Sequence, residues 1–146
     1  LTSDSTIQYQ IGVTYVELNL YDEALEYFIN YNLNDPDSIF MAGLCYYELA
    51  NYEDAIDWFN QYLEINNNNV EIDYYKGLCY FYINDFKNSA KHLKRVIKTN
   101  KNNPLALYYL GLNYLKLDKT REAKKTLNNL YYLDTALYDS LSQLIN

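Results

Sequence analysis

The chain has 146 residues, of which 49% are hydrophobic, and its formal net charge is −7. This length gives room for one domain or one array of repeats, and the apolar content argues against a disordered chain. No stretch reaches the roughly 18 apolar residues of a membrane span, and no signal-peptide pattern opens the sequence.

The chain begins with Leu rather than Met, which indicates a piece of a longer protein.

The four glycines of the chain, Gly12, Gly43, Gly77 and Gly111, stand 31, 34 and 34 residues apart. The segment GLCYYELANYEDA begins at Gly43, and GLCYFYINDFKNSA begins at Gly77. The spacing of the glycines and the similarity of these segments together predict four repeats, at about residues 5–35, 36–69, 70–103 and 104–134.

We expect each repeat to form two helices joined by a short turn, because apolar residues recur at helical spacing on both sides of a polar break. The breaks contain Asn19, Asn51, Asn84 with Asp85, and Asp118. In chain order the expected helices cover residues 5–18, 22–33, 37–50, 53–65, 71–83, 87–99, 104–117 and 120–132. The spacing of 31 shortens the second helix of the first repeat by about one turn.

Two further signals mark helix ends. Pro36 and Pro104 stand where the first turn of a helix tolerates proline. Residues 135–146 predict a helix that caps the open end of the array, since its apolar residues lie on one side.

A glycine inside a helix costs about 1 kcal/mol relative to alanine, so each one needs a structural reason. A small residue follows each glycine twelve positions later: Ala24, Ala55, Ser89 and Ala123. We expect small residues to face each other there and to let the two helices of a repeat approach closely.

These residues resemble the tetratricopeptide repeat (TPR) family over about residues 5–134. The matching pattern is the glycine, a Tyr three residues later (Tyr15, Tyr46, Tyr80, Tyr114), the small residue, and then Phe28, Phe59, Leu93 or Leu127. The resemblance implies an all-α fold in a single TPR domain over residues 1–146: an α-solenoid with a right-handed superhelix that serves protein–protein interaction. Gln8, Asp73 and Lys76 depart from the apolar pattern, and the last two predict a local ion pair or a functional polar notch.

The residue types that carry chemistry are sparse. Cys45 and Cys79 predict two buried thiols, which weakly favours the cytoplasm or another reducing compartment. His92 lies in the Lys-rich segment KHLKR and is expected at the solvated surface. We find no catalytic constellation, no metal-ligand spacing and no phosphate-binding loop, so we expect neither an enzyme nor a cofactor.

The resemblance further implies that first helices line a concave groove. The matching positions are Tyr9, Val13, Val16, Phe40, Leu44, Tyr47, Tyr74, Leu78, Phe81, Tyr108, Leu112 and Leu115. All are apolar or aromatic, so we expect an apolar peptide or amphipathic helix to bind there, or a neighbouring copy. Glu17 and Glu48 flank these positions and favour a ligand with Lys or Arg. The alternative is that part of the strip belongs to the core between repeats.

Charge is divided along the chain. All twelve Lys and Arg lie at or after Lys76, whereas fourteen of the nineteen Asp and Glu precede it, which gives −14 for residues 1–75 and +7 for the remainder. This division suggests a self-assembling scaffold whose acidic and basic halves meet. A regulatory arm of a larger protein is a further alternative. Nucleic-acid binding is disfavoured by the net charge and by the lack of aromatic residues among the basic ones.

Overall fold

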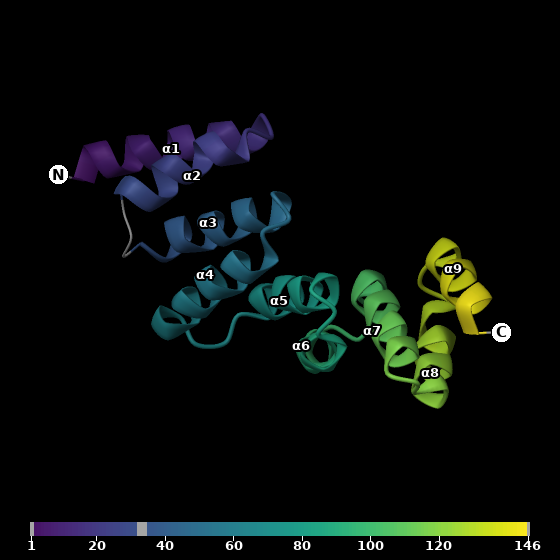
Figure 1. Ribbon diagram of the computed structural model, residues 1–146. Coiled ribbons are helices and arrows are strands. Elements are labelled where there is room, and N and C mark those ends of the chain that lie inside the picture. Colours follow the sequence, from purple (N-terminus) through teal and green to yellow (C-terminus); the bar gives the residue numbers. More distant parts are fainter. Residues whose placement is uncertain (1, 32–34, 146) are drawn as a thin grey trace. The chain divides into compact units, whose positions relative to one another are not determined.

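The computed structural model describes residues 2–31 and 35–145, and all regular secondary structure in these ranges is α-helical (Figure 1). The helices are α1 (Thr2–Glu17), α2 (Tyr21–Tyr31), α3 (Pro36–Glu48), α4 (Tyr52–Ile65), α5 (Val70–Tyr82), α6 (Phe86–Thr99), α7 (Pro104–Lys116), α8 (Thr120–Leu130) and α9 (Thr135–Ile145). The chain divides into two compact parts, which we call the N-terminal unit (1–69) and the C-terminal unit (70–146).

The helices expected from the sequence are confirmed, most of them with bounds that agree to within two residues. The first helix begins three residues earlier than expected, and the expected end of the second at residue 33 lies outside the described ranges. Pro36 and Pro104 open α3 and α7 as predicted. The predicted shortening of the second helix concerns the same end of that helix, next to residues outside the described ranges, and stays a prediction.

Within each unit the helices pack in chain order. In the N-terminal unit α2 lies against both α1 and α3, α3 packs on α4, and α1 also contacts α3. In the C-terminal unit α6 lies between α5 and α7, while α9 packs on both α7 and α8. First helices therefore contact one another within a unit, and second helices fill the space between them. This is the packing of an α-solenoid.

The helices α1, α3, α5 and α7 all end in the same kind of turn. One residue adopts a left-handed conformation: Asn19, Ala50, Asn84 or Asp118, with φ between 56° and 64°. The amide of the following residue then donates to the carbonyl of the repeat tyrosine, as Asn51 does to Tyr46 at 2.9 Å. These bonds form the Schellman motif, which satisfies carbonyls at a helix end. In the turn between α3 and α4 the left-handed residue is Ala50, directly before Asn51.

The glycines make room for a large side chain as well as for a small one. A Cβ atom at Gly43 would lie 2.6 Å from Cε1 of Phe59, and one at Gly12 would lie 2.8 Å from the ring of Phe28. The expectation of small facing small is therefore incomplete, although Ala24 and Ala55 are fully buried. At Gly77 both the bulky Leu93 and the small Ser89 lie close to the glycine. The Ser89 hydroxyl donates to the Gly77 carbonyl at 2.6 Å.

The C-terminal unit contains a buried polar cluster between α5 and α6. Nδ1 of His92 donates to the Asp73 carboxylate at 2.7 Å, and Nη1 of Arg95 lies 3.3 Å from the same oxygen. His92 is only 7% exposed and stacks on Tyr80, so the expectation of a solvated histidine is wrong. Burial lowers the pKa of His92, and the hydrogen bond to Asp73 opposes this shift.

The same cluster bears on the predicted pairing of Asp73 with Lys76. The described contacts of the Asp73 carboxylate come from α6, across the helix interface, whereas the prediction placed its partner on its own helix. Lys76 is itself buried, and this burial lowers the pKa of its ammonium group, while the charge of Asp73 opposes the shift. The cluster thus connects two helices.

Gly43→Ala should lower the free energy of unfolding by about 1 to 2 kcal/mol. The new methyl group presses against the buried Phe59 ring, and this overpacking outweighs the better helix propensity of alanine. Urea unfolding measures the change. Phe59→Leu removes the ring atoms in the clash, so the double variant should be more stable than the sum of the single effects. Strictly additive effects would show that the ring does not require the glycine.

Asp73→Asn should destabilise the protein by about 2 to 3 kcal/mol, because it removes the carboxylate that His92 and Arg95 share while Lys76 stays buried beside it. Asp139→Asn, an exposed change of the same kind on α9, should change stability by less than about 0.5 kcal/mol. Thermal unfolding of the two variants, followed by circular dichroism, gives the comparison. Equal stabilities would mean that the cluster contributes nothing.

Candidate protein-interaction surfaces

In the N-terminal unit the expected groove residues lie on α1 and α3, two helices that contact each other. We call this set the N-terminal strip: Tyr9, Val13 and Val16 on α1, with Phe40, Leu44 and Tyr47 on α3. All six side chains are half-buried, and α1 contacts α3. The strip is thus a surface of partly accessible apolar side chains rather than a fully exposed one.

The aromatic side chains of the N-terminal strip are held in place by rings from the second helices. Tyr9 meets Phe28 edge to face, with ring centroids 5.7 Å apart, and Phe40 lies 5.9 Å from Tyr62. Burial raises the pKa of Tyr9, and the nearby charges of Asp37 and Asp35 add to the rise. Rings fixed in this way lose little conformational freedom when a ligand covers them.

The acidic residues expected beside the strip, Glu17 and Glu48, are both exposed. The N-terminal unit contains twelve Asp and Glu and no Lys or Arg, so its formal charge is −12. Cys45 lies buried in this unit, and burial together with the charge of Glu48 raises the pKa of its thiol to about 12. A thiol with so high a pKa is a poor nucleophile. Both cysteines are free and buried, as predicted.

The corresponding residues of the C-terminal unit are more enclosed. This C-terminal strip consists of Tyr74, Leu78 and Phe81 on α5, with Tyr108, Leu112 and Leu115 on α7. Leu78 is only 4% exposed and belongs to the core. The hydroxyl groups of Tyr108 and Ser140 lie 3.1 Å apart, so α9 reaches over α7. Leu112 and Leu115 pack against a core cluster that includes Leu141 of α9.

Sequence reasoning missed two tyrosines at the edge of the C-terminal strip. The hydroxyl groups of Tyr82 and Tyr109 lie 2.9 Å apart, and the Tyr109 ring meets Phe81 at 5.2 Å. Burial and the bond to Tyr82 raise the pKa of Tyr109 to about 12. The signal was available, because each tyrosine directly follows an expected strip residue.

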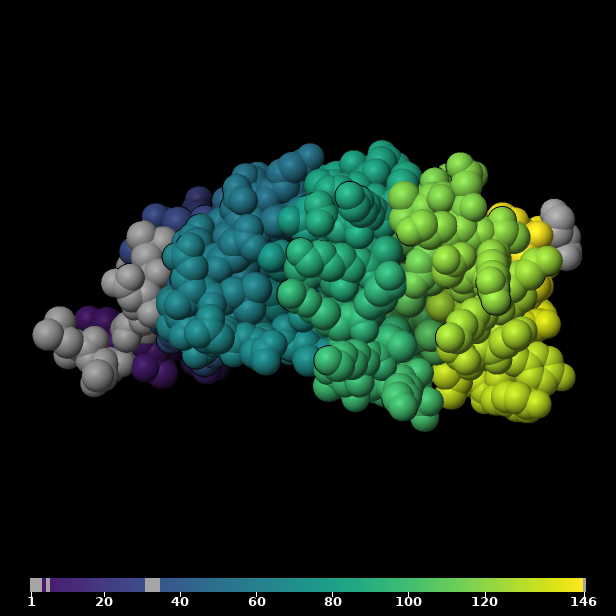
Figure 2. All heavy atoms as spheres, turned by 90° about the horizontal axis from the view of Figure 1, so that it is seen from below, coloured from purple at the N-terminus to yellow at the C-terminus, as the bar shows by residue number. Residues whose placement is uncertain are grey.

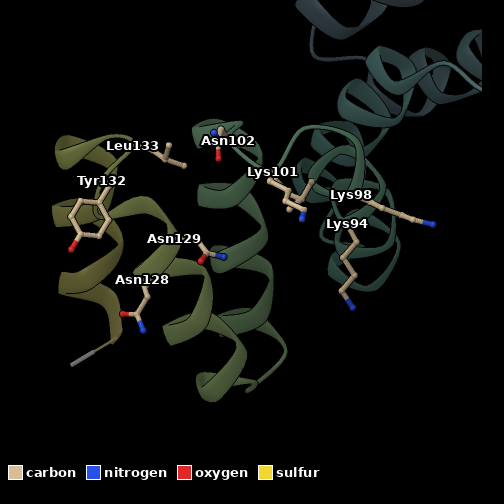
Figure 3. A pocket seen from close by; sticks show the side chains of 9 residues that line it. Lys94, Lys98, Lys101, Asn102, Asn128, Asn129, Tyr132 and Leu133 are labelled. Atoms are coloured by element: carbon tan, nitrogen blue, oxygen red, sulfur yellow. The ribbon is translucent and has the colours of Figure 1, made fainter.

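A second surface is formed by the outward sides of α6 and α8 in the C-terminal unit. Figure 2 shows α6 in green beside α8 in yellow-green. A hollow of about 780 Å³ lies between them, lined by Lys94, Ile97, Lys98, Lys101, Asn102, Asn128, Asn129, Tyr132 and Leu133 (Figure 3). Its lining combines ammonium groups, amides and exposed apolar side chains. The unit has twelve Lys and Arg and seven Asp and Glu, which gives a formal charge of +5.

A third, smaller apolar surface lies on α1. Ile11, Thr14, Tyr15 and Leu18 line a hollow of about 300 Å³. Leu18 is 61% exposed, and Ile7, one turn before Ile11, is 53% exposed. The spacing of Ile7, Ile11, Thr14 and Leu18 follows one helix face, so the sequence contained this signal as well.

The described residues contain no group of three or more His, Cys, Asp or Glu side chains placed to hold a metal ion. None of the described helices combines the length and the apolar character needed to cross a membrane.

Comparisons with known proteins agree on the repeat. Two tetratricopeptide repeat models match residues 5–32 and 105–133, and a model described as anaphase-promoting complex, cyclosome, subunit 3 matches residues 25–96. No curated protein matches the sequence.

Solved structures of MamA proteins are similar in fold. MamA from Desulfovibrio magneticus RS-1 has 21% sequence identity, with a TM-score of 0.90 over 97% of this chain and 84% of that one. Another MamA structure has 18% identity and a TM-score of 0.83 over 99% of this chain and 89% of its own. MamA of strain AMB-1 has 17% identity and a TM-score of 0.83 over 92% and 75%.

The repeated glycine-to-tyrosine pattern, the paired helices and the family models lead to one conclusion. The chain belongs to the tetratricopeptide repeat family and has its all-α solenoid fold, which serves protein–protein interaction or scaffolding.

Proposed function

We propose that the N-terminal strip binds an apolar peptide segment or an amphipathic helix that carries Lys or Arg. The observation that supports this is a half-buried set of six apolar side chains, flanked by exposed Glu17 and Glu48 in a unit without a basic residue. The more enclosed C-terminal strip offers less apolar surface to such a ligand, since Leu78 is buried and α9 reaches over α7.

Apolar contact supplies the affinity in this proposal and charge supplies the selectivity. Burial of apolar surface contributes about 25 cal/mol per Å² before the costs of association. Aromatic side chains already fixed by their neighbours, such as Tyr9 and Phe40, are typical anchors for a bound helix. Glu17 and Glu48 lie at the rim, where a charge affects the association rate and the choice of partner more than the affinity.

A charge-reversed pair, Glu17→Lys with Glu48→Lys, should weaken binding of a basic amphipathic peptide about tenfold. The change converts two attractive rim contacts into repulsive ones, each worth up to about 1 kcal/mol. The probe is a dye-labelled 14-residue peptide of Leu and Lys in a helical pattern, followed by fluorescence anisotropy. A peptide with Ser in place of Leu keeps the charge and should not bind, because it lacks the apolar face.

The matched control is Glu53→Lys with Glu64→Lys on α4. It changes the net charge by the same amount at exposed positions away from the strip, and it should reduce the affinity less than threefold. Equal weakening by the two pairs would mean that the peptide senses only the overall charge, and the proposal would fail. Substitution of Leu78 is unsuitable as a test, because a charge at this core position would unfold the unit.

A further inference from the structure

We propose that two copies of this chain associate through their second helices, with the acidic face of one N-terminal unit against the basic face of the other copy's C-terminal unit. The acidic face consists of the exposed Asp22, Glu26, Glu53, Asp57 and Glu64 on α2 and α4. The basic face consists of the exposed Lys87, Lys91, Lys98, Arg121 and Lys125 on α6 and α8. This surface is separate from the N-terminal strip.

The two faces occupy equivalent positions of the repeat and differ in sign. Three of the four acidic residues of α4 have a lysine 34 residues later in α6: Glu53 and Lys87, Asp57 and Lys91, Glu64 and Lys98. Within each helix these residues are spaced by four and seven, so they line one side. Since α4 and α6 correspond in the repeat, the two rows of charge have the same spacing and can lie opposite each other.

These charges are not neutralised within the described part of the chain. The ion pairs found there belong to Asp73, and neither the six residues of α4 and α6 nor those of α2 and α8 take part. A row of like charges four residues apart is self-repulsive. The N-terminal unit has no Lys or Arg with which to relieve this repulsion, whereas the basic face of a second copy would relieve it on both sides.

The hollow beside α6 adds an apolar part to this contact. Tyr132 is 89% exposed and lines the hollow together with Leu133, at the end opposite Lys98 (Figure 3). On the acidic face Ile65 is 49% exposed and directly follows Glu64. The acidic face thus has an apolar side chain beside a carboxylate, and the hollow on the basic face has both apolar side chains and ammonium groups in its lining.

A second copy explains both faces, whereas a polyanion would explain only one. A nucleic acid could contact the Lys row, but it would leave the acidic row without a partner, and the net charge of −7 would repel it. The acidic and basic rows correspond residue for residue, which favours a partner with the same repeat.

Sedimentation velocity over a concentration series tests this association. At about 20 mM NaCl the wild-type chain should form oligomers, and at about 500 mM the dissociation constant should rise at least tenfold, because salt screens exposed charges. A wild-type chain that stays monomeric at about 100 µM in low salt would overturn the proposal. So would an oligomer that salt does not weaken.

A charge exchange provides the sharper test. The triple variant Glu53→Lys, Asp57→Lys, Glu64→Lys and the opposite variant Lys87→Glu, Lys91→Glu, Lys98→Glu should each be monomeric in low salt, since the α4 row and the α6 row of each variant then have the same sign. Mixed in equal amounts, the two variants should associate. Circular dichroism controls for folding. Failure of the mixture to associate would contradict the proposal, while peptide binding to the N-terminal strip would be unaffected by that result.

Discussion

The close contact between a glycine on a first helix and a bulky side chain on its partner is the constraint on which this structure depends. At Gly43 the Phe59 ring occupies the space where any other residue would place its Cβ atom. Gly12 with Phe28 and Gly77 with Leu93 repeat the arrangement. The contact sets how closely the two helices of these three pairs approach each other, whereas the nearest side chain to a Cβ atom at Gly111 is Leu141 of α9.

The third repeat varies this contact and compensates with polar bonds. Leu93 takes the place of phenylalanine there, and Ser89 takes the place of alanine. Asn113 of α7 donates to the Ser89 hydroxyl at 2.8 Å, and Ser89 donates to the Gly77 carbonyl, so one buried chain of bonds joins α5, α6 and α7. Together with the pairing of Asp73 and His92, these bonds specify how the helices align, which apolar contacts alone do less strictly.

The fold could be predicted from sequence because its determinants are local and repeated. Glycine spacing, the tyrosine three residues later and the polar turns identify every helix pair. The errors came where one residue's environment depends on another helix. His92 appeared solvated among lysines, yet it lies on the side of α6 that also carries Ser89 and Val96, both buried. A buried Asp73 on α5 needs such a partner. Left-handed Ala50 shows, similarly, that the repeat's geometry overrides the preference of a single residue.

Exposure along the strips was harder to predict, because it depends on packing between repeats. The same pattern of first-helix positions leaves Leu44 half-buried but places Leu78 in the core. Around α7 the exposure of the strip residues depends on α9, because Ser140 and Leu141 of α9 lie against side chains of α7. Since side-chain packing rather than helix periodicity decides these differences, a sequence pattern identifies the candidate surface but not its accessible part.

The repeat separates the residues that determine the fold from those that can vary in charge. Core contacts use the glycine and the small residue of each pair, with a bulky residue facing the glycine in the pairs α1–α2, α3–α4 and α5–α6, while the outward positions of the second helices make no such contacts. Their sign can therefore change from Glu53 and Asp57 to Lys87 and Lys91 without altering the helix pair that carries them. In the same way, the apolar surface of the first helices can vary independently of that charge. One chain of this kind can thus offer two surfaces of different chemistry, and mutations on one need not disturb the other.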